Sequence, residues 1–159
     1  MHTFCADLHV HTVLSPCAEV EMIPPLIVRE ALEHRIDIIA ITDHNASANV
    51  RAVQKAADGT GLTVLPGMEV QTREDVHLLC LFASLSDLET WQRTVDLSLP
   101  DTLNQPEYFG EQYIVDENGE YIRTETRLLL TATEFSIEEV IQQVAELGGL
   151  VIPAHVDRK

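Results

Sequence analysis

Residues 36–45 read Ile-Asp-Ile-Ile-Ala-Ile-Thr-Asp-His-Asn and combine the two patterns that decide the fold of this chain. The run from Ile36 to Thr42 is almost continuously apolar and β-branched, which is typical of a strand buried on both faces of a parallel sheet. Polar residues follow at once. Because the carboxyl ends of parallel strands share one edge of a sheet or one rim of a barrel, polar residues there indicate a functional site.

Strand and helix patterns alternate on both sides of this run. The other expected strands are 3–8, 62–70, 76–83 and 150–154, and the expected helices are about 24–34, 50–57, 86–95 and 136–147. Only a few polar residues separate the strands at 62–70 and 76–83, so we predict that these two pair antiparallel. The alternation as a whole predicts an α/β fold.

The section from residue 87 to residue 146 is acidic, with 14 Asp and Glu against three Arg. We interpret 99–131 as an excursion with a solvated acidic face, away from the rim, rather than as an acidic binding tail. Within it, Asn118-Gly119 is typical of a two-residue hairpin turn. Ser136 and Glu139 then have the spacing of a capping box. The apolar stripe expected on the helix that follows consists of Ile137, Val140, Ile141, Val144 and Leu147.

Composition limits the possible functions. The chain has 159 residues, which suffices for a hydrophobic core, and a formal net charge of −16, which disfavours binding to long nucleic acids. Three cysteines are too few for a disulfide framework and favour a reducing, cytoplasmic environment. No apolar run approaches the roughly 20 residues of a membrane span, and we expect neither a signal peptide nor a membrane partner.

Histidines and carboxylates gather at the predicted strand ends. The five histidines are His9, His11, His44, His77 and His155, and the two carboxylates are Asp43 and Glu69. Because the strand at 76–83 runs back along its neighbour, His77 at its start comes to the same rim as Glu69. A single histidine in such a place is commonly structural, but the whole set predicts a metal site. Imidazole with carboxylate suits Zn, Mn or Fe rather than Ca.

Other polar residues have two interpretations each. Cys17, six residues after His11, is either an ordinary loop thiol or, as a thiolate, a metal ligand. Asp43 is either part of the site or the cap of the next helix, and Glu69 is either a ligand or a solvated loop acid. Cys5 and Cys80 lie in apolar strands, where we expect them to be buried.

Five segments in this order resemble the PHP family, the polymerase and histidinol phosphatase superfamily of metal-dependent phosphoesterases. They are DLHVHT (7–12), ITDHN (41–45), GMEV (67–70), VH (76–77) and PAHVDR (153–158). The resemblance implies a distorted (β/α)7 TIM-like barrel with two or three divalent metal ions at its C-terminal rim. It implies that His9 and His11 hold the first ion and that Glu69 bridges the first and second ions. It also implies that His77 and His155 complete the ligands of the second ion. By the same resemblance, His44 binds the third ion and Asp43 orients its surroundings.

The chain departs from the family pattern in two places. Where many members have His or Asp after the His-x-His pair, this chain has Pro16-Cys17, so either Cys17 replaces that ligand or the third site is weak. The family's final Asp-x-His is absent, and a TIM-type barrel takes about 250 residues. We therefore expect residues 1–159 to be the N-terminal portion of a PHP domain. A barrel incomplete at its C-terminus exposes strand edges, which favours association with a second copy.

The resemblance implies hydrolysis of a small phosphomonoester or phosphodiester, such as a nucleotide or histidinol phosphate, by a metal-bridged hydroxide. Glu69, His155 and Arg158 are the candidate catalytic residues, with His155 protonating the leaving group and Arg158 clamping phosphate. One alternative is a catalytically incomplete metal-binding module with a structural or regulatory role. A metal-dependent amidohydrolase is a second alternative, disfavoured because such enzymes usually place a lysine in the site and the only lysines here are Lys55 and Lys159.

Overall fold

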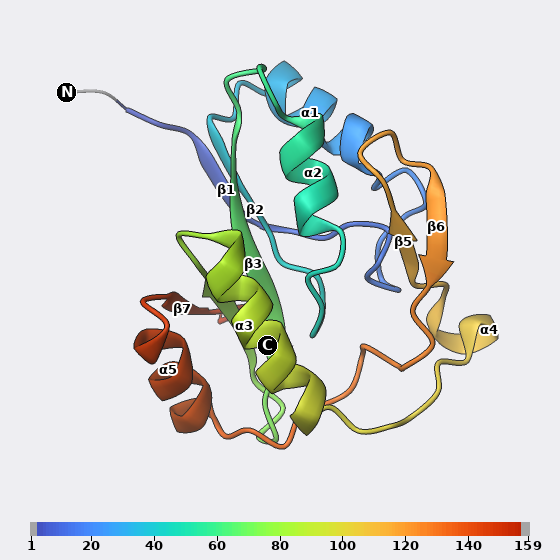
Figure 1. Ribbon diagram of the computed structural model, residues 1–159, viewed down its shortest axis with the longest axis vertical. Helices are drawn as coiled ribbons and strands as arrows, with labels where there is room; N and C mark the ends of the chain where they lie inside the picture. The colour runs from blue at the N-terminus through green and yellow to red at the C-terminus, as the bar shows by residue number, and fades with distance from the viewer. Residues whose placement is uncertain (1–2, 157–159) are drawn as a thin grey trace.

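Five strands form one curled sheet in the order β1-β2-β3-β4-β7 in the computed structural model, which describes residues 3–156 (Figure 1). The strands are β1 (Ala6–Val10), β2 (Ile38–Ile41), β3 (Thr63–Gln71), β4 (His77–Leu81) and β7 (Leu150–Pro153). The first three are parallel, and β4 is antiparallel to both β3 and β7, as predicted for β3 and β4. Because β7 therefore runs in the direction of β1–β3, the ends of these four strands and the start of β4 share one rim.

Four helices cover one face of the sheet: α1 (Pro24–Glu33), α2 (Val50–Ala56), α3 (Leu85–Ser98) and α5 (Ile137–Glu146). Alternate strand residues enter this core, among them Ile39, Met68, Val70 and Cys80. Since side chains of a strand alternate between faces, Glu69, between Met68 and Val70, points to the opposite, concave face. The architecture is the mixed α/β half-barrel expected of an incomplete PHP-type barrel.

Two burial predictions are wrong. Cys5 is exposed, because it precedes β1, an edge strand with a neighbour on one side only. Ile141 is 47% exposed, although the capping box of Ser136 and Glu139 is confirmed. Helix α5 packs on β7, which is also an edge strand. Because the sheet ends there, only the helix face that contains Val140 and Val144 is fully buried.

The excursion contains the predicted hairpin, formed by β5 (Tyr113–Val115) and β6 (Tyr121–Thr124) and preceded by the short helix α4 (Pro106–Phe109). The predicted two-residue turn is wrong, because the backbone of Asp116 pairs with that of Glu120 and leaves three residues between them. The Asp116 carboxylate also accepts the N–H groups of Asn118 and Glu120, and Gly119 has a φ of 82°. This is the three-residue turn in which a left-handed glycine forms a bulge.

The excursion packs against the rim loops, contrary to our expectation. The Asn45 side chain donates to the backbone carbonyls of Leu129 (2.9 Å) and Thr131 (2.8 Å). The Asn49 side chain donates to the carbonyl of Tyr113 (3.0 Å). A second apolar cluster joins the same regions through Leu14, Ala46, Leu99, Ile114 and Leu129. The inner side of the excursion therefore supports the loops that follow β1 and β2.

Candidate metal centre

Glu69 lies at the centre of the concave face, with its side chain fully buried. Its Oε2 atom lies 3.3 Å from His9 Nε2, 3.2 Å from His11 Nε2 and 3.2 Å from His44 Nδ1. Its Oε1 atom lies 3.0 Å from His77 Nδ1 and 3.3 Å from His155 Nε2. The structure thus brings five histidines from separate parts of the sequence around one carboxylate.

The strand geometry explains how these side chains meet. His9 and His11 flank Val10, which packs against the helix-covered core, so both imidazoles point to the concave face. His44 follows β2 and is joined to β3 because the backbone N–H of Glu69 donates to the Asp43 carbonyl (3.1 Å) and that of Asn45 donates to the Glu69 carbonyl (2.8 Å).

His77 and His155 reach the rim from the antiparallel half of the sheet. His77 begins β4 opposite Gln71, two residues beyond Glu69 on β3. His155 follows β7 and has a φ of 54°, in the left-handed region that residues other than glycine rarely adopt. Backbone strain of this kind clusters at functional sites, where surrounding contacts hold it in place.

Electrostatics keep the carboxylate charged and one imidazole neutral. Burial by itself would raise the pKa of Glu69, but His11, His77 and His9 around it hold that pKa well below its usual range. Burial lowers the pKa of His44 to about 4, against the opposing attraction of Glu69. An ionised carboxylate and a neutral imidazole are the forms in which these groups bind metal ions.

The donor set fits metal ions better than it fits hydrogen bonding within the protein. Within residues 3–156, Glu69 Oε2 and His44 Nδ1 are buried and have no hydrogen-bond partner, although ring nitrogens lie close by. Leaving buried polar atoms unpaired costs free energy, so such atoms commonly indicate a ligand. Three sets of ligand atoms lie within 4.8 Å of one another: His9–His11–Glu69, His44–Glu69–His77 and His11–Cys17–His44.

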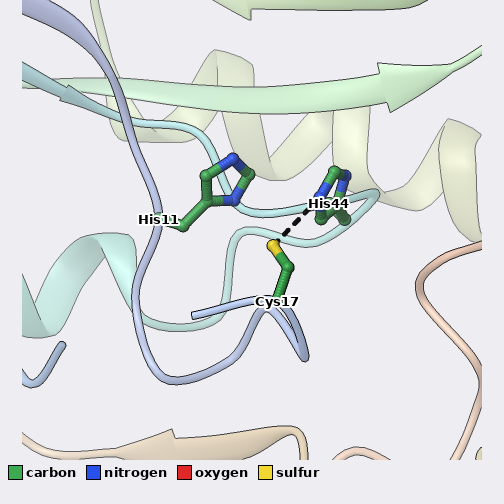
Figure 2. Close-up of side chains that lie close together, drawn as sticks. All are labelled: His11, Cys17 and His44. Atoms are coloured by element: carbon green, nitrogen blue, oxygen red, sulfur yellow. Dashed lines mark hydrogen bonds between the residues drawn. The ribbon is translucent and has the colours of Figure 1, made fainter. Parts of the chain in front are cut away.

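Cys17 lies in the third of these sets. Figure 2 shows its side chain pointing toward His44, and Cys17 Sγ is 3.4 Å from His44 Nε2. Burial, with Glu69 and Asp43 nearby, raises the pKa of the thiol against an opposing backbone hydrogen bond, so the free thiol stays protonated. A metal ion would displace that proton, because metal ions bind cysteine as the thiolate.

Asp43 lies beneath the imidazoles. Its carboxylate accepts hydrogen bonds from the backbone N–H and hydroxyl of Thr12 and from the hydroxyl of Ser15, each at 2.7 Å. Burial raises the pKa of Asp43, and His11 and the hydrogen bonds from Ser15 and Thr12 oppose that rise. The alternative that Asp43 caps the next helix is wrong, since Asn49 occupies that position.

Sequence reasoning missed Thr12 and Ser15, and it proposed one residue that cannot be placed. Thr12 and Ser15 are fully buried. The only available signal was their position between His11 and Cys17, because hydroxyl residues in a loop follow no periodic pattern. Arg158, the predicted phosphate clamp, lies outside the described residues.

A carboxylate ringed by imidazoles at the rim of a curled α/β sheet defines a metal-binding protein of the TIM-like barrel class. The chain belongs to the PHP domain family, whose sequence profile matches residues 7–135. Members of this family are metal-dependent hydrolases, and its phosphoesterases use divalent metal ions.

The chain matches one part of a longer curated relative. It is 32% identical over 80 residues to the 5′-3′ exoribonuclease Rnm of Salmonella typhimurium, an alignment that covers 47% of this chain and 26% of Rnm. The matched part is therefore about a quarter of the length of that relative.

Two solved structures share the fold. A Bifidobacterium adolescentis protein described as a metal-dependent phosphoesterase has a TM-score of 0.59 and 21% identity, over 97% of this chain and 68% of its own. The lesion-specific endonuclease Q of Pyrococcus furiosus has a TM-score of 0.65 and 18% identity, over 96% of this chain and 34% of its own. Separately, none of the helices within residues 3–156 is long and apolar enough to cross a membrane.

Proposed function

We propose that this chain forms the metal-binding part of a phosphoesterase and hydrolyses a small phosphomonoester or phosphodiester. The observation that carries the proposal is the buried, unpartnered Oε2 atom of Glu69 within a ring of five imidazoles. Glu69 Oε2 has no hydrogen-bond partner among residues 3–156, and a divalent cation would supply one.

The residues around Glu69 would suit three ions. His9 and His11 would hold the first ion, His77 and His155 would hold the second, and Glu69 would serve both. The nitrogen atoms of His44 face both Glu69 and Cys17, so His44 would serve the third ion together with Cys17. Nitrogen, oxygen and sulfur donors together favour Zn or Fe, and Mn for the sites without sulfur.

Divalent ions bound there would lower the pKa of a coordinated water toward neutrality and offset the charge that develops on the phosphoryl group. Glu69 is ionised and His44 is neutral, the forms in which these groups would bind an ion. The His155 side chain is 33% exposed, but holding the second ion would take up its lone pair, so we retain His155 as a ligand and not as the proton donor to the leaving group. We assign Arg158 the role of a phosphate clamp.

The substrate we propose is a nucleotide, histidinol phosphate or a similar small ester, in a reducing cytoplasm. The net charge of −16 opposes a long phosphate backbone, and the side chains that face Glu69 among the described residues are histidines, with no Lys or Arg paired to it. The names of Rnm and endonuclease Q point instead to nucleic acid. A panel that contains free nucleotides, short oligonucleotides and sugar phosphates separates the two substrate classes.

Substitution of the central carboxylate tests the proposal. Glu69→Gln keeps the shape of the side chain but removes its charge, so bound metal and hydrolysis should both fall sharply while the far-UV circular dichroism stays native. Glu89→Gln, which breaks only an exposed ion pair with Arg51, serves as the matched control. Full metal content and activity in Glu69→Gln would contradict the proposal, and metal binding without turnover of any ester would contradict its catalytic part.

A further inference from the structure

We propose that Ser15 is a positioning residue that holds His11 in the tautomer able to bind a metal ion through Nε2. The inference deepens the proposed function and rests on it, since it concerns how one ligand of the metal centre is prepared. Ser15 is fully buried beneath the imidazoles.

The Ser15 hydroxyl has three neighbours. Its Oγ lies 2.7 Å from Asp43 Oδ1, 2.9 Å from His11 Nδ1 and 3.1 Å from the backbone nitrogen of His44. A serine hydroxyl has one proton to donate and two lone pairs that accept. Three neighbours therefore occupy the one donor and both acceptor positions of the hydroxyl. One neighbour must accept the Ser15 proton, and the other two must donate to Ser15 Oγ.

Two of the three roles follow from the chemistry of the partners. The backbone N–H of His44 can only donate. The Asp43 carboxylate already accepts the N–H and the hydroxyl of Thr12, so it is the acceptor that takes the Ser15 proton.

The Thr12 hydroxyl supports this assignment. Thr12 Oγ1 accepts the backbone N–H of Leu14 (3.2 Å) and the side-chain amide of Asn49 (3.0 Å). With both lone pairs occupied, its own proton goes to Asp43 Oδ2. The carboxylate thus receives protons at both of its oxygens and acts as an acceptor throughout.

The remaining lone pair of Ser15 faces His11. Since the Ser15 proton points to Asp43, His11 Nδ1 must carry a proton and donate it to Ser15. A neutral imidazole then has its lone pair on Nε2, the atom that lies 3.2 Å from Glu69 Oε2 and 3.1 Å from His9 Nε2. That atom is the one placed to bind an ion.

The hydroxyl also ties two loops together. Through His11 and the backbone of His44, Ser15 connects the segment that follows β1 with the segment that follows β2. Hydrogen-bond partners of this kind fix both ring orientation and tautomer of a ligating histidine, and removing them typically costs about 10- to 100-fold in metal affinity.

Two measurements on the 159-residue chain test the role of Ser15. The first is the protonation of the two ring nitrogens of His11 in the metal-free wild type, read from two-bond 1H–15N correlations. We expect the proton on Nδ1. A proton on Nε2 would overturn the proposal without any variant having to fold.

The second measurement is zinc affinity, determined by competition with a chromogenic chelator. Ser15→Ala should bind zinc about 10- to 100-fold more weakly than the wild type. Ser98→Ala, which removes another buried hydroxyl far along α3, should bind as the wild type does. Wild-type affinity in Ser15→Ala would overturn the proposal. A wild-type chain that binds no zinc would instead contradict the proposed function, while the tautomer measurement still decides the role of Ser15.

Discussion

The rings of His9 and His155 lie 5.0 Å apart, although one stands on the first strand of the sheet and the other follows the last. In a flat sheet, four spacings of about 4.8 Å would hold those strands about 19 Å apart. The sheet therefore curls enough that side chains from its two edge strands meet over the concave face. This curl is what allows an edge histidine from each side to reach the same carboxylate, Glu69.

Removal of metal should destabilise the protein. Ions that bind only the folded chain stabilise it by about 4 kcal/mol when their concentration is a thousand times Kd. We expect scanning calorimetry to show a lower Tm after treatment with a chelator and its recovery after zinc is added back. Glu69→Gln, as the control, should respond much less. An unchanged Tm in the chelated wild type would contradict the metal centre.

Substitution of Cys17 should remove sulfur from the third ligand set. Cobalt(II) bound to a thiolate absorbs strongly in the near ultraviolet, so the cobalt-loaded wild type should show this band and Cys17→Ser should lack it. Cys5 is also exposed but lies outside the three ligand sets, and Cys5→Ser should keep the band. Persistence of the band in Cys17→Ser would show that Cys17 is not a ligand.

Asn45 should contribute more to stability than a loop residue normally does. Its side chain donates to Leu129 and Thr131 and accepts the N–H of Gln71, and its φ is 48°. Asn45→Ala loses these bonds and adds backbone strain, so urea unfolding should show a loss of about 2–4 kcal/mol.

A second variant at the same position separates the two causes. Asn45→Gly tolerates the positive φ but loses the same hydrogen bonds, so it should be destabilised less than Asn45→Ala. A change within about 0.5 kcal/mol in both variants, the range of ordinary surface substitutions, would show that the excursion is not held through Asn45.

The capping box of α5 should make stability depend on pH. The backbone N–H of Ser136 donates to Glu139 Oε2 at 2.7 Å, and this hydrogen bond holds the pKa of Glu139 below its ordinary value of 4.5. A carboxyl whose folded pKa is depressed stabilises the fold above its unfolded pKa. That contribution is lost as the pH falls from 4.5 through the lower, folded pKa.

Comparison with an amide at the same position isolates this effect. Glu139→Gln keeps an oxygen that accepts the Ser136 N–H but does not titrate. Urea unfolding of both proteins between about pH 6 and pH 3 should therefore show a steeper loss of stability in the wild type. Parallel curves would mean that the capping carboxylate contributes nothing that depends on its charge.

Local patterns predicted much of the fold and the convergence of five histidines on one rim. The β-branched run at 36–42 indicated a strand, because burial on both faces leaves an almost continuous apolar run in the sequence. Ser136 and Glu139 gave a correct helix start, since a capping box is complete within four residues. The histidines were found because strand ends share a rim.

Errors arose where a neighbour distant in sequence decides the environment. Cys5 and Ile141 were expected to be buried because their side chains are apolar, but burial also requires a neighbouring element. Cys5 precedes the edge strand β1 and Ile141 lies on the helix over the edge strand β7, where no further strand covers them. The turn at Asn118-Gly119 has three residues and not the predicted two, because the Asp116 carboxylate accepts hydrogen bonds from two backbone N–H groups. The placement of the excursion against the rim depends on Asn45 and Asn49, whose amides contact residues far along the chain.

The residue types and their order are thus enough to identify a PHP-type α/β sheet and the groups that converge on its rim. Folding in three dimensions added the curl that joins His9 to His155, the approach of Cys17 to His44, and the hydrogen bonds of Ser15 beneath His11. Periodicity reports which face of an element is buried, because that follows from local backbone geometry. Distances between groups that come from different elements depend on how those elements pack, and no local pattern encodes them.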